Sequence, residues 1–218
     1  QLVTPEVEQA RHIVVGRDAT LDPQLVWRGK FPGDDPANAT DLVADAPLPS
    51  NALAFDIGTG TGVLAAILAR RGISRIVATD QDPRALTCAR TNLERLGLTD
   101  RVEVVQADLF PEGRAPRPTS PIEQAIYDPE SRMLSGFLSG LAAHLEPGGE
   151  GWLLLSDLAE HLELRTRAEL LAAFDQAGLV VLGKTDIRPH HPRASDQADP
   201  LRAARAAEIT SLWRLGIR

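Results

Sequence analysis

The chain has 218 residues, a formal net charge of −7 and an apolar content of 43%. This length fits one α/β domain with a short extension, and the apolar content is sufficient for a buried core. The negative charge argues against a broad nucleic-acid-binding surface, and no apolar run reaches the roughly eighteen residues of a membrane-spanning helix. The single cysteine, Cys88, excludes an internal disulfide and a zinc cluster, so a reducing cytoplasm is expected. The sixteen prolines and the many Ala, Arg and Leu residues suggest a bacterial source.

The first fifty residues show little continuous pattern, so residues 1–50 are expected to be an N-terminal extension and 51–218 the main domain. That domain opens with the sequence AFDIGTGTGVL, residues 54–64. An apolar run ends at Asp56, and then Gly58, Gly60 and Gly62 alternate with threonines before a helical pattern begins. Glycine lacks a Cβ and tolerates positive φ, so a ligand can lie against bare backbone here. The stretch predicts a strand–loop–helix unit that binds a nucleotide-type cofactor.

The spacing of the three glycines separates two cofactor classes. The dinucleotide fingerprint is G-x-G-x-x-G, and here Val63 stands where that pattern needs its third glycine. An acid followed by G-x-G-x-G instead resembles motif I of the class I S-adenosylmethionine-dependent methyltransferases. The resemblance implies S-adenosylmethionine as cofactor and S-adenosylhomocysteine as product. It also places Asp56 near the methionine ammonium and the loop residues Gly58, Thr59, Gly60 and Gly62 against the cofactor.

Two further strands are predicted to end in acids on the same edge of the sheet. The run 75–80 ends at Asp80, where a carboxylate can accept both ribose hydroxyls of a nucleoside. Asp82 and Pro83 predict the start of a helix that Gly97 ends. The run 102–108 then ends at Asp108. In the resembled family an acid there contacts the adenine amino group, so the cofactor-binding set is completed by Asp80, Gln81, Asp108 and Leu109.

The C-terminal half predicts a helix over 131–144, a buried strand over 151–156, a helix over 166–177 and two β-rich runs at 180–187 and 208–215. The strand at 151–156 lacks alternation, as expected when both faces are covered. The resemblance covers about residues 51–218. It implies a Rossmann-like, doubly wound, seven-stranded α/β sheet, mostly parallel, with an antiparallel last strand.

One expected element is missing. Residues 127–136 resemble a segment of the methyltransferases that act on amino or amide nitrogens, namely the release-factor glutamine and rRNA guanine enzymes. In them an Asn-Pro-Pro-aromatic motif follows the fourth strand, and here it should lie between Phe110 and Tyr127. Because no such strand or motif is present, we infer that residues are missing between about Gly113 and Pro118. The alternative is a natural deletion in a non-catalytic protein. No catalytic residue is assigned.

The expected function is methyl transfer to an amino or amide nitrogen, of rRNA or of a protein glutamine. Two alternatives are a small-metabolite methyltransferase and a nicotinamide-dependent oxidoreductase. The connection before the last strand is basic and could hold phosphates, although nearby aspartates also make it an ordinary solvated loop: its cationic residues are Arg188, His190, His191, Arg193, Arg202 and Arg205. No metal site and no membrane contact are predicted, since adjacent histidines without spaced carboxylates are a weak metal signal.

Overall fold

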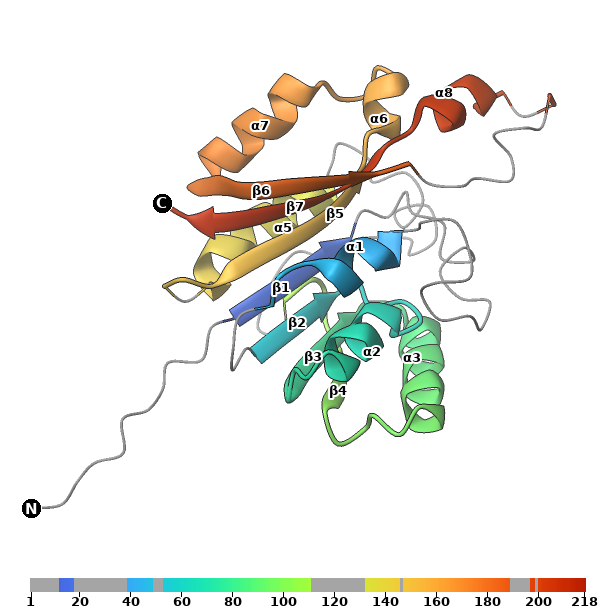
Figure 1. Cartoon of the computed structure of the whole chain (residues 1–218), viewed down its shortest axis with the longest axis vertical. Helices are drawn as coiled ribbons and strands as arrows, with labels where there is room; N and C mark the ends of the chain where they lie inside the picture. The colour runs from blue at the N-terminus through green and yellow to red at the C-terminus, as the bar shows by residue number, and fades with distance from the viewer. Residues whose placement is uncertain are drawn as a thin grey trace, which may run out of the picture.

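The computed structural model describes residues 12–17, 39–48, 53–110, 132–145, 147–188, 197–198 and 200–218. Within these residues, seven strands form one sheet in the order β4-β3-β2-β1-β5-β7-β6 (Figure 1). The strands are β1 (His12–Arg17), β2 (Leu53–Ile57), β3 (Arg75–Asp80), β4 (Val102–Gln106), β5 (Glu150–Ser156), β6 (Leu179–Ile187) and β7 (Thr210–Ile217). Strands β1 to β5 are parallel, and β7 runs antiparallel to both β5 and β6. The Rossmann-like α/β architecture is confirmed.

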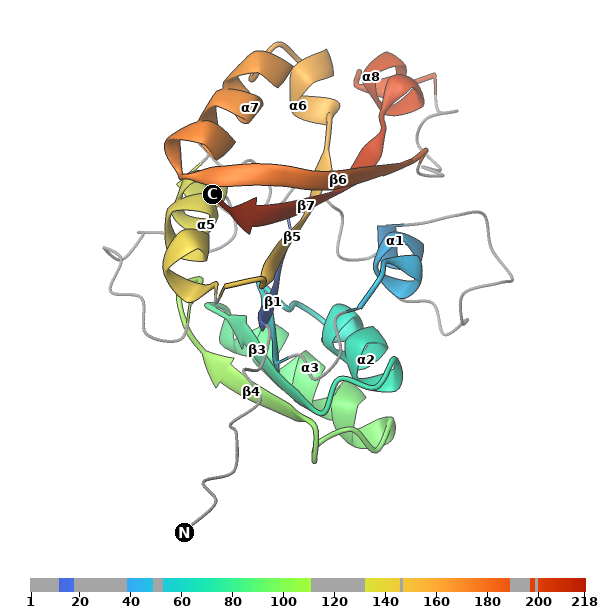
Figure 2. The same cartoon turned by 60° about the vertical axis from the view of Figure 1, so that its left-hand side comes forward.

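Helices cover both faces of this sheet, with α1 and α2 on one side and α5 on the other (Figure 2). The helices are α1 (Ala39–Asp45), α2 (Val63–Arg70), α3 (Pro83–Arg95), α5 (Arg132–His144), α6 (Leu158–His161), α7 (Arg167–Gln176) and α8 (Arg202–Ala207). The core on the first face joins side chains of α1, α2 and α3 to the sheet, and the core on the second face joins those of α5 and α7. The molecule is therefore a three-layer α/β/α sandwich.

Strand β5 shows why the central run of the sequence lacks alternation. Trp152 and Leu154 point into the core on the α1–α2 face, whereas Leu153 and Leu155 point into the core on the α5–α7 face. All four side chains are buried. A strand covered on both sides must be apolar at every position, so the helices that cover the two faces of β5 explain the pattern that the sequence shows.

The helix boundaries follow local capping chemistry. The Asp82 carboxylate accepts the Arg84 amide N–H at 2.9 Å, and Pro83 occupies the first helical position of α3. Thr166 and Glu169 form a reciprocal capping box at the start of α7. These starts agree with the predicted ones. The short helices α6 and α8 were not predicted. Helix α6 follows the carboxyl end of β5, and α8 precedes the start of β7 (Figure 1).

Residues from the expected N-terminal extension form part of the sheet. Strand β1 lies between β2 and β5, with Val15 opposite Asp56 on one side and opposite Trp152 on the other. Helix α1 buries Leu42 and Val43 in the core on the α2 face. A strand from residues 12–17 therefore lies beside β2 at the centre of the sheet. The predicted gap and motif between Gly113 and Pro118 lie outside the described residues.

Within the described residues, no helix is both long and apolar enough to cross a membrane.

The central position of β1 yields a stability prediction. We expect Val15→Pro to lower the free energy of unfolding by about 3 kcal/mol or more, because proline removes a ladder hydrogen bond in the middle of a sheet. Val15→Ala keeps the backbone N–H and is the matched control. Thermal and urea unfolding, followed by circular dichroism, measure the difference between the two variants. Equal stability of the two would show that β1 does not hold the centre of the sheet.

Candidate functional site

The three acids predicted to bind the cofactor lie at or just beyond the ends of three neighbouring parallel strands. Asp56 lies in β2, Asp80 is the last residue of β3, and Asp108 comes two residues after β4. The register pairs Asp56 with Ala78 and Asp80 with Gln106, so these strands end at a common edge. In open α/β sheets, ligands bind at the carboxyl ends of the strands. The structure therefore places all three acids at the expected edge.

Asp56 lies beneath the glycine loop rather than on its surface. Only 1% of the residue is exposed. Its Oδ2 accepts the Thr59 hydroxyl at 2.7 Å and the Ala65 amide N–H at 3.1 Å. Ala65 is the third residue of α2, whose N-cap, Gly62, has no side chain to cap the helix. Asp56 thus caps α2 from the neighbouring strand and also fixes Thr59, which is itself buried.

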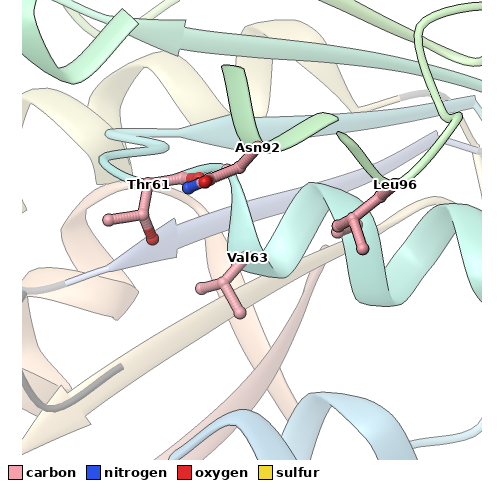
Figure 3. A pocket seen from close by; sticks show the side chains of 6 residues that line it. Thr61, Val63, Asn92 and Leu96 are labelled. Atoms are coloured by element: carbon pink, nitrogen blue, oxygen red, sulfur yellow. The ribbon is translucent and has the colours of Figure 1, made fainter. Parts of the chain in front are cut away.

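The loop backbone has a shape that glycine allows at little cost. Gly58, Gly60 and Gly62 have φ values of 70°, 56° and 80°, in the left-handed region. A Cβ at Gly62 would also lie 3.3 Å from the Cα and Cβ of Ala89, so α2 and α3 approach closely there. The Asn92 side chain donates to the Thr61 carbonyl at 2.9 Å. Figure 3 shows Asn92 and Thr61 side by side above a small hollow whose lining, from α2, α3 and the loop, includes none of the three acids.

Asp80 connects the loop to the next strand ends. Its Oδ2 accepts the Gly60 amide N–H at 2.9 Å, and its Oδ1 accepts the Asp82 amide N–H at 2.9 Å. Its backbone carbonyl accepts the Ala107 amide N–H at 3.1 Å. The neighbouring Gln81 is half-buried, and its carbonyl accepts the Gln106 side-chain amide at 3.2 Å. One residue therefore ties β2, β3 and β4 together at the edge where the cofactor is expected.

The third acid begins a turn with an unusual backbone. Leu109, the residue after Asp108, has a φ of 66°, which costs a leucine roughly 1–2 kcal/mol. Its carbonyl accepts the Thr79 hydroxyl at 2.7 Å, and Thr79 is fully buried. Asp108 itself is half-buried. Burial raises the pKa of the Asp108 carboxyl above its ordinary value.

Thr79 is the site residue that the sequence analysis missed. A threonine inside an otherwise apolar strand, directly before the acid, is the signal that marks it.

Ser156 and Glu208 were also not predicted to have a role. Ser156 is the last residue of β5, and Glu208 comes two residues before β7. Glu208 accepts the Ser156 hydroxyl at 2.6 Å, and burial raises the pKa of its carboxyl. Asp157 directly follows Ser156 in the sequence. Its Oδ1 accepts the Ile209 amide N–H at 2.7 Å and lies 3.4 Å from His161 Nε2.

Comparison with known proteins shows that part of the chain is similar to methyltransferases. Residues 54–149 match the family described as "Methyltransferase domain". The ribosomal protein L11 methyltransferase of Pelotomaculum thermopropionicum is 38% identical over 129 residues, which are 58% of this chain and 38% of that protein. Residues 54–149 are therefore similar to S-adenosylmethionine-dependent methyltransferase domains. The chain spans about two fifths of the length of the curated relatives it matches.

Solved structures of the same fold include two methyltransferases. A geranyl diphosphate methyltransferase in complex with S-adenosylmethionine matches with a TM-score of 0.60 and 14% identity, covering 82% of this chain and 84% of that one. The ribosomal protein L11 methylase of Lactobacillus delbrueckii subsp. bulgaricus matches with a TM-score of 0.54 and 16% identity, covering 83% and 77%. These likenesses establish the fold.

The burial of Asp108 predicts the pH dependence of stability. Its folded pKa lies above the unfolded value, so its charged form opposes folding at neutral pH, and this penalty disappears as the pH falls through the raised pKa. We therefore expect Asp108→Asn to raise the melting temperature at pH 7, by an amount that shrinks as the pH falls toward about 4. Thermal unfolding at several pH values measures this. The exposed Glu103→Gln on β4 is the control, and a lower melting temperature of Asp108→Asn at pH 7 would contradict the expectation.

Proposed function

We propose that the protein transfers a methyl group from S-adenosylmethionine to a nitrogen of a protein acceptor. The proposal rests on the set of three carboxylates at one sheet edge, two of which, Asp56 and Asp80, accept hydrogen bonds from Thr59 and Gly60 of the glycine loop. Similarity to ribosomal protein L11 methyltransferases supports a protein acceptor. The formal charge of −7 favours this over rRNA, whose phosphates need a basic surface. The proposed unit takes in β1 and α1 as well as residues 51–218.

The three acids suggest how this chain holds its cofactor. Asp108 and Leu109 are proposed to meet adenine, the Asp80 carboxylate to accept the ribose hydroxyls with Gln81 beside it, and Gly58 to Gly60 to face the methionine end. Each carboxylate oxygen can accept more than one hydrogen bond, so Asp80 retains acceptor capacity after bonding Gly60 and Asp82. Asp56 is proposed to place its negative charge under the methionine end while it fixes Thr59 and the helix start.

The same geometry argues against a nicotinamide dinucleotide. Dinucleotide sites place a pyrophosphate at the amino end of the helix after the glycine loop. In this chain the buried Asp56 carboxylate already accepts the Ala65 amide N–H of that helix turn. A pyrophosphate there would meet a like charge in a buried, low-dielectric environment, which is unfavourable. A cofactor that carries an ammonium group in place of phosphates is compatible with that charge.

The cofactor supplies a methyl group already activated by its sulfonium, so the protein's contribution is to hold the nucleophile in line and away from water. The acceptor side is proposed to be built from the carboxyl ends of β1 and β5, which follow β2 in the sheet. The polar groups there include the Asp157 carboxylate at the start of α6 and His161 at its end. The predicted Asn-Pro-Pro-aromatic motif remains an expectation, and no catalytic residue is assigned.

Loss of the Asp80 carboxylate tests the cofactor site. Asp80→Ala removes a proposed acceptor of the ribose hydroxyls and frees the Gly60 amide, so we expect the Kd for S-adenosylhomocysteine to rise by about 10-fold to 100-fold. Isothermal titration of wild type, Asp80→Ala and Glu103→Gln measures it, with NADH as the competing ligand. Unchanged affinity in Asp80→Ala would remove Asp80 from the ribose site, and NADH binding without S-adenosylhomocysteine binding would refute the methyltransferase proposal.

Transfer of a radiolabelled methyl group identifies the acceptor class. We expect label from S-adenosylmethionine to enter a total ribosomal protein fraction and not the protein-free rRNA, because the acidic chain lacks the charge for broad RNA binding. Asp80→Ala provides the control for enzyme-dependent labelling. Label in protein-free rRNA alone would favour the rRNA alternative. Label only in small molecules would favour the metabolite alternative.

A further inference from the structure

Two glycines of α5 hold the turn that follows Asp108, although they lie far from it in the sequence. A Cβ built at Gly136 would lie 2.6 Å from Leu109 Cδ1, and one built at Gly140 would lie 2.4 Å from Phe110 Cε2. At Gly140 the added Cβ would meet three atoms of the buried Phe110 ring, so α5 needs glycine there for the turn to lie where it does. At Gly136 it would meet only the end of the Leu109 side chain, which would have to turn aside. Gly136 and Gly140 are four residues apart and share one face of the helix.

Phe110 is fixed in this contact from several sides. It is 3% exposed, and its ring stacks on His144 with a centroid separation of 4.2 Å and an interplanar angle of 15°. Phe137 stacks on it at 6.1 Å. The His144 Nδ1 lies 2.8 Å from the Gly140 carbonyl, and because a carbonyl only accepts, Nδ1 is the donor and the ring orientation is fixed. The Phe110 ring therefore packs directly against Gly140 and His144.

Contacts from outside the turn must stabilise it, because the backbone conformation of Leu109 is unfavourable. Leu109 keeps a φ of 66° only if its surroundings oppose relaxation to negative φ. Thr79 holds its carbonyl from β3 at 2.7 Å, and Gly136 receives its side chain from α5. One contact fixes the backbone and the other the side chain, so the turn is clamped between two elements that belong to different parts of the chain.

We infer that Gly136 and Gly140 are positioning residues that set the Asp108 carboxylate for recognition of the adenine amino group. This inference rests on the proposed function, since it assigns these glycines a role in the proposed adenine contact. The class of ligand recognised is a purine nucleoside with an exocyclic amino group. The glycines contact Leu109 and Phe110, so their effect on binding is expected to pass through the turn.

The sign of a Gly→Ala change makes the inference testable. In an ordinary helix interior, Gly→Ala stabilises the protein by roughly 0.5–1 kcal/mol. For Gly140→Ala we expect the reverse: the Phe110 ring moves and residues 108–110 lose their fixed position. Ser135→Ala, at an exposed position on the same helix, is the matched control. Phe110→Leu, combined with Gly140→Ala, supplies room for the new methyl group and is expected to restore the turn in part.

Two readouts separate a positioning role from a merely structural one. The first is hydrogen exchange of peptides covering 105–110 in the ligand-free chain, which we expect to accelerate by about tenfold in Gly140→Ala, against little change in Ser135→Ala. The second is the ratio of Kd values for S-adenosylhomocysteine and its hypoxanthine analogue, in which a carbonyl replaces the adenine amino group. Wild type should prefer the amino form, and we expect this preference to fall about fivefold or more in Gly140→Ala and to recover in the double variant.

The outcomes distinguish failure of the inference from failure of the proposed function. Unchanged exchange and an unchanged ratio in Gly140→Ala would overturn the inference while leaving the methyltransferase proposal intact. A fall in affinity for both ligands by the same factor would show a structural role only, and would also overturn it. If wild type bound neither ligand, the proposed function would fail, and with it the adenine role, whereas the exchange data would still report whether the glycines hold the turn. Should Gly140→Ala not fold, Gly136→Ala with Leu109→Ala as its size-compensating partner provides the same test.

Discussion

The glycine loop is the constraint on which the site depends, and two carboxylates hold it. A loop of alternating glycines has little side chain to fix it, and glycine loses more backbone freedom on folding than any other residue. Asp56 holds Thr59 and the first turn of α2 from below, and Asp80 holds Gly60 from the neighbouring strand. Hydrogen bonds to a charged acceptor are stronger than neutral ones, especially where water is scarce. The loop is thus shaped by the residues whose positions also define the cofactor edge.

This arrangement makes the cofactor site a property of three strands rather than of one motif. Asp80 joins the loop to β4 through the Ala107 amide, and Thr79, one residue earlier, holds the turn after Asp108. Movement of β3 would therefore alter both the proposed ribose and adenine contacts together. On the other face, α5 closes the turn through Gly140 and Phe110. The sheet edge and the helix layer act on the same short segment from opposite sides, so the site depends on the packing of the whole sandwich.

Local signals were sufficient to predict most of the elements from residue 53 onward. Asp82-Pro83, Thr166 with Glu169, and the apolar run at 151–156 each act over a few residues, so the sequence alone reveals them. The role of Asp56 as a cap for α2 was not predictable, because its partner Ala65 is reached only through the turn of the loop. Leu109 in the left-handed region was equally hidden, since its cause lies on β3 and α5.

Strand β1 shows the same limit at the scale of the fold. Residues 12–17 make an ordinary short apolar run, and nothing within them indicates that they insert between β2 and β5. Their position is explained by the neighbouring strands, because β2 and β5 would otherwise each leave a row of backbone groups unpaired inside the sandwich. Pairing β1 with β5 closes a long loop, which costs entropy that only the packed sheet repays. The centre of the sheet, and the edge from which an acceptor would be approached, are therefore completed by the segment that carries the weakest local signal.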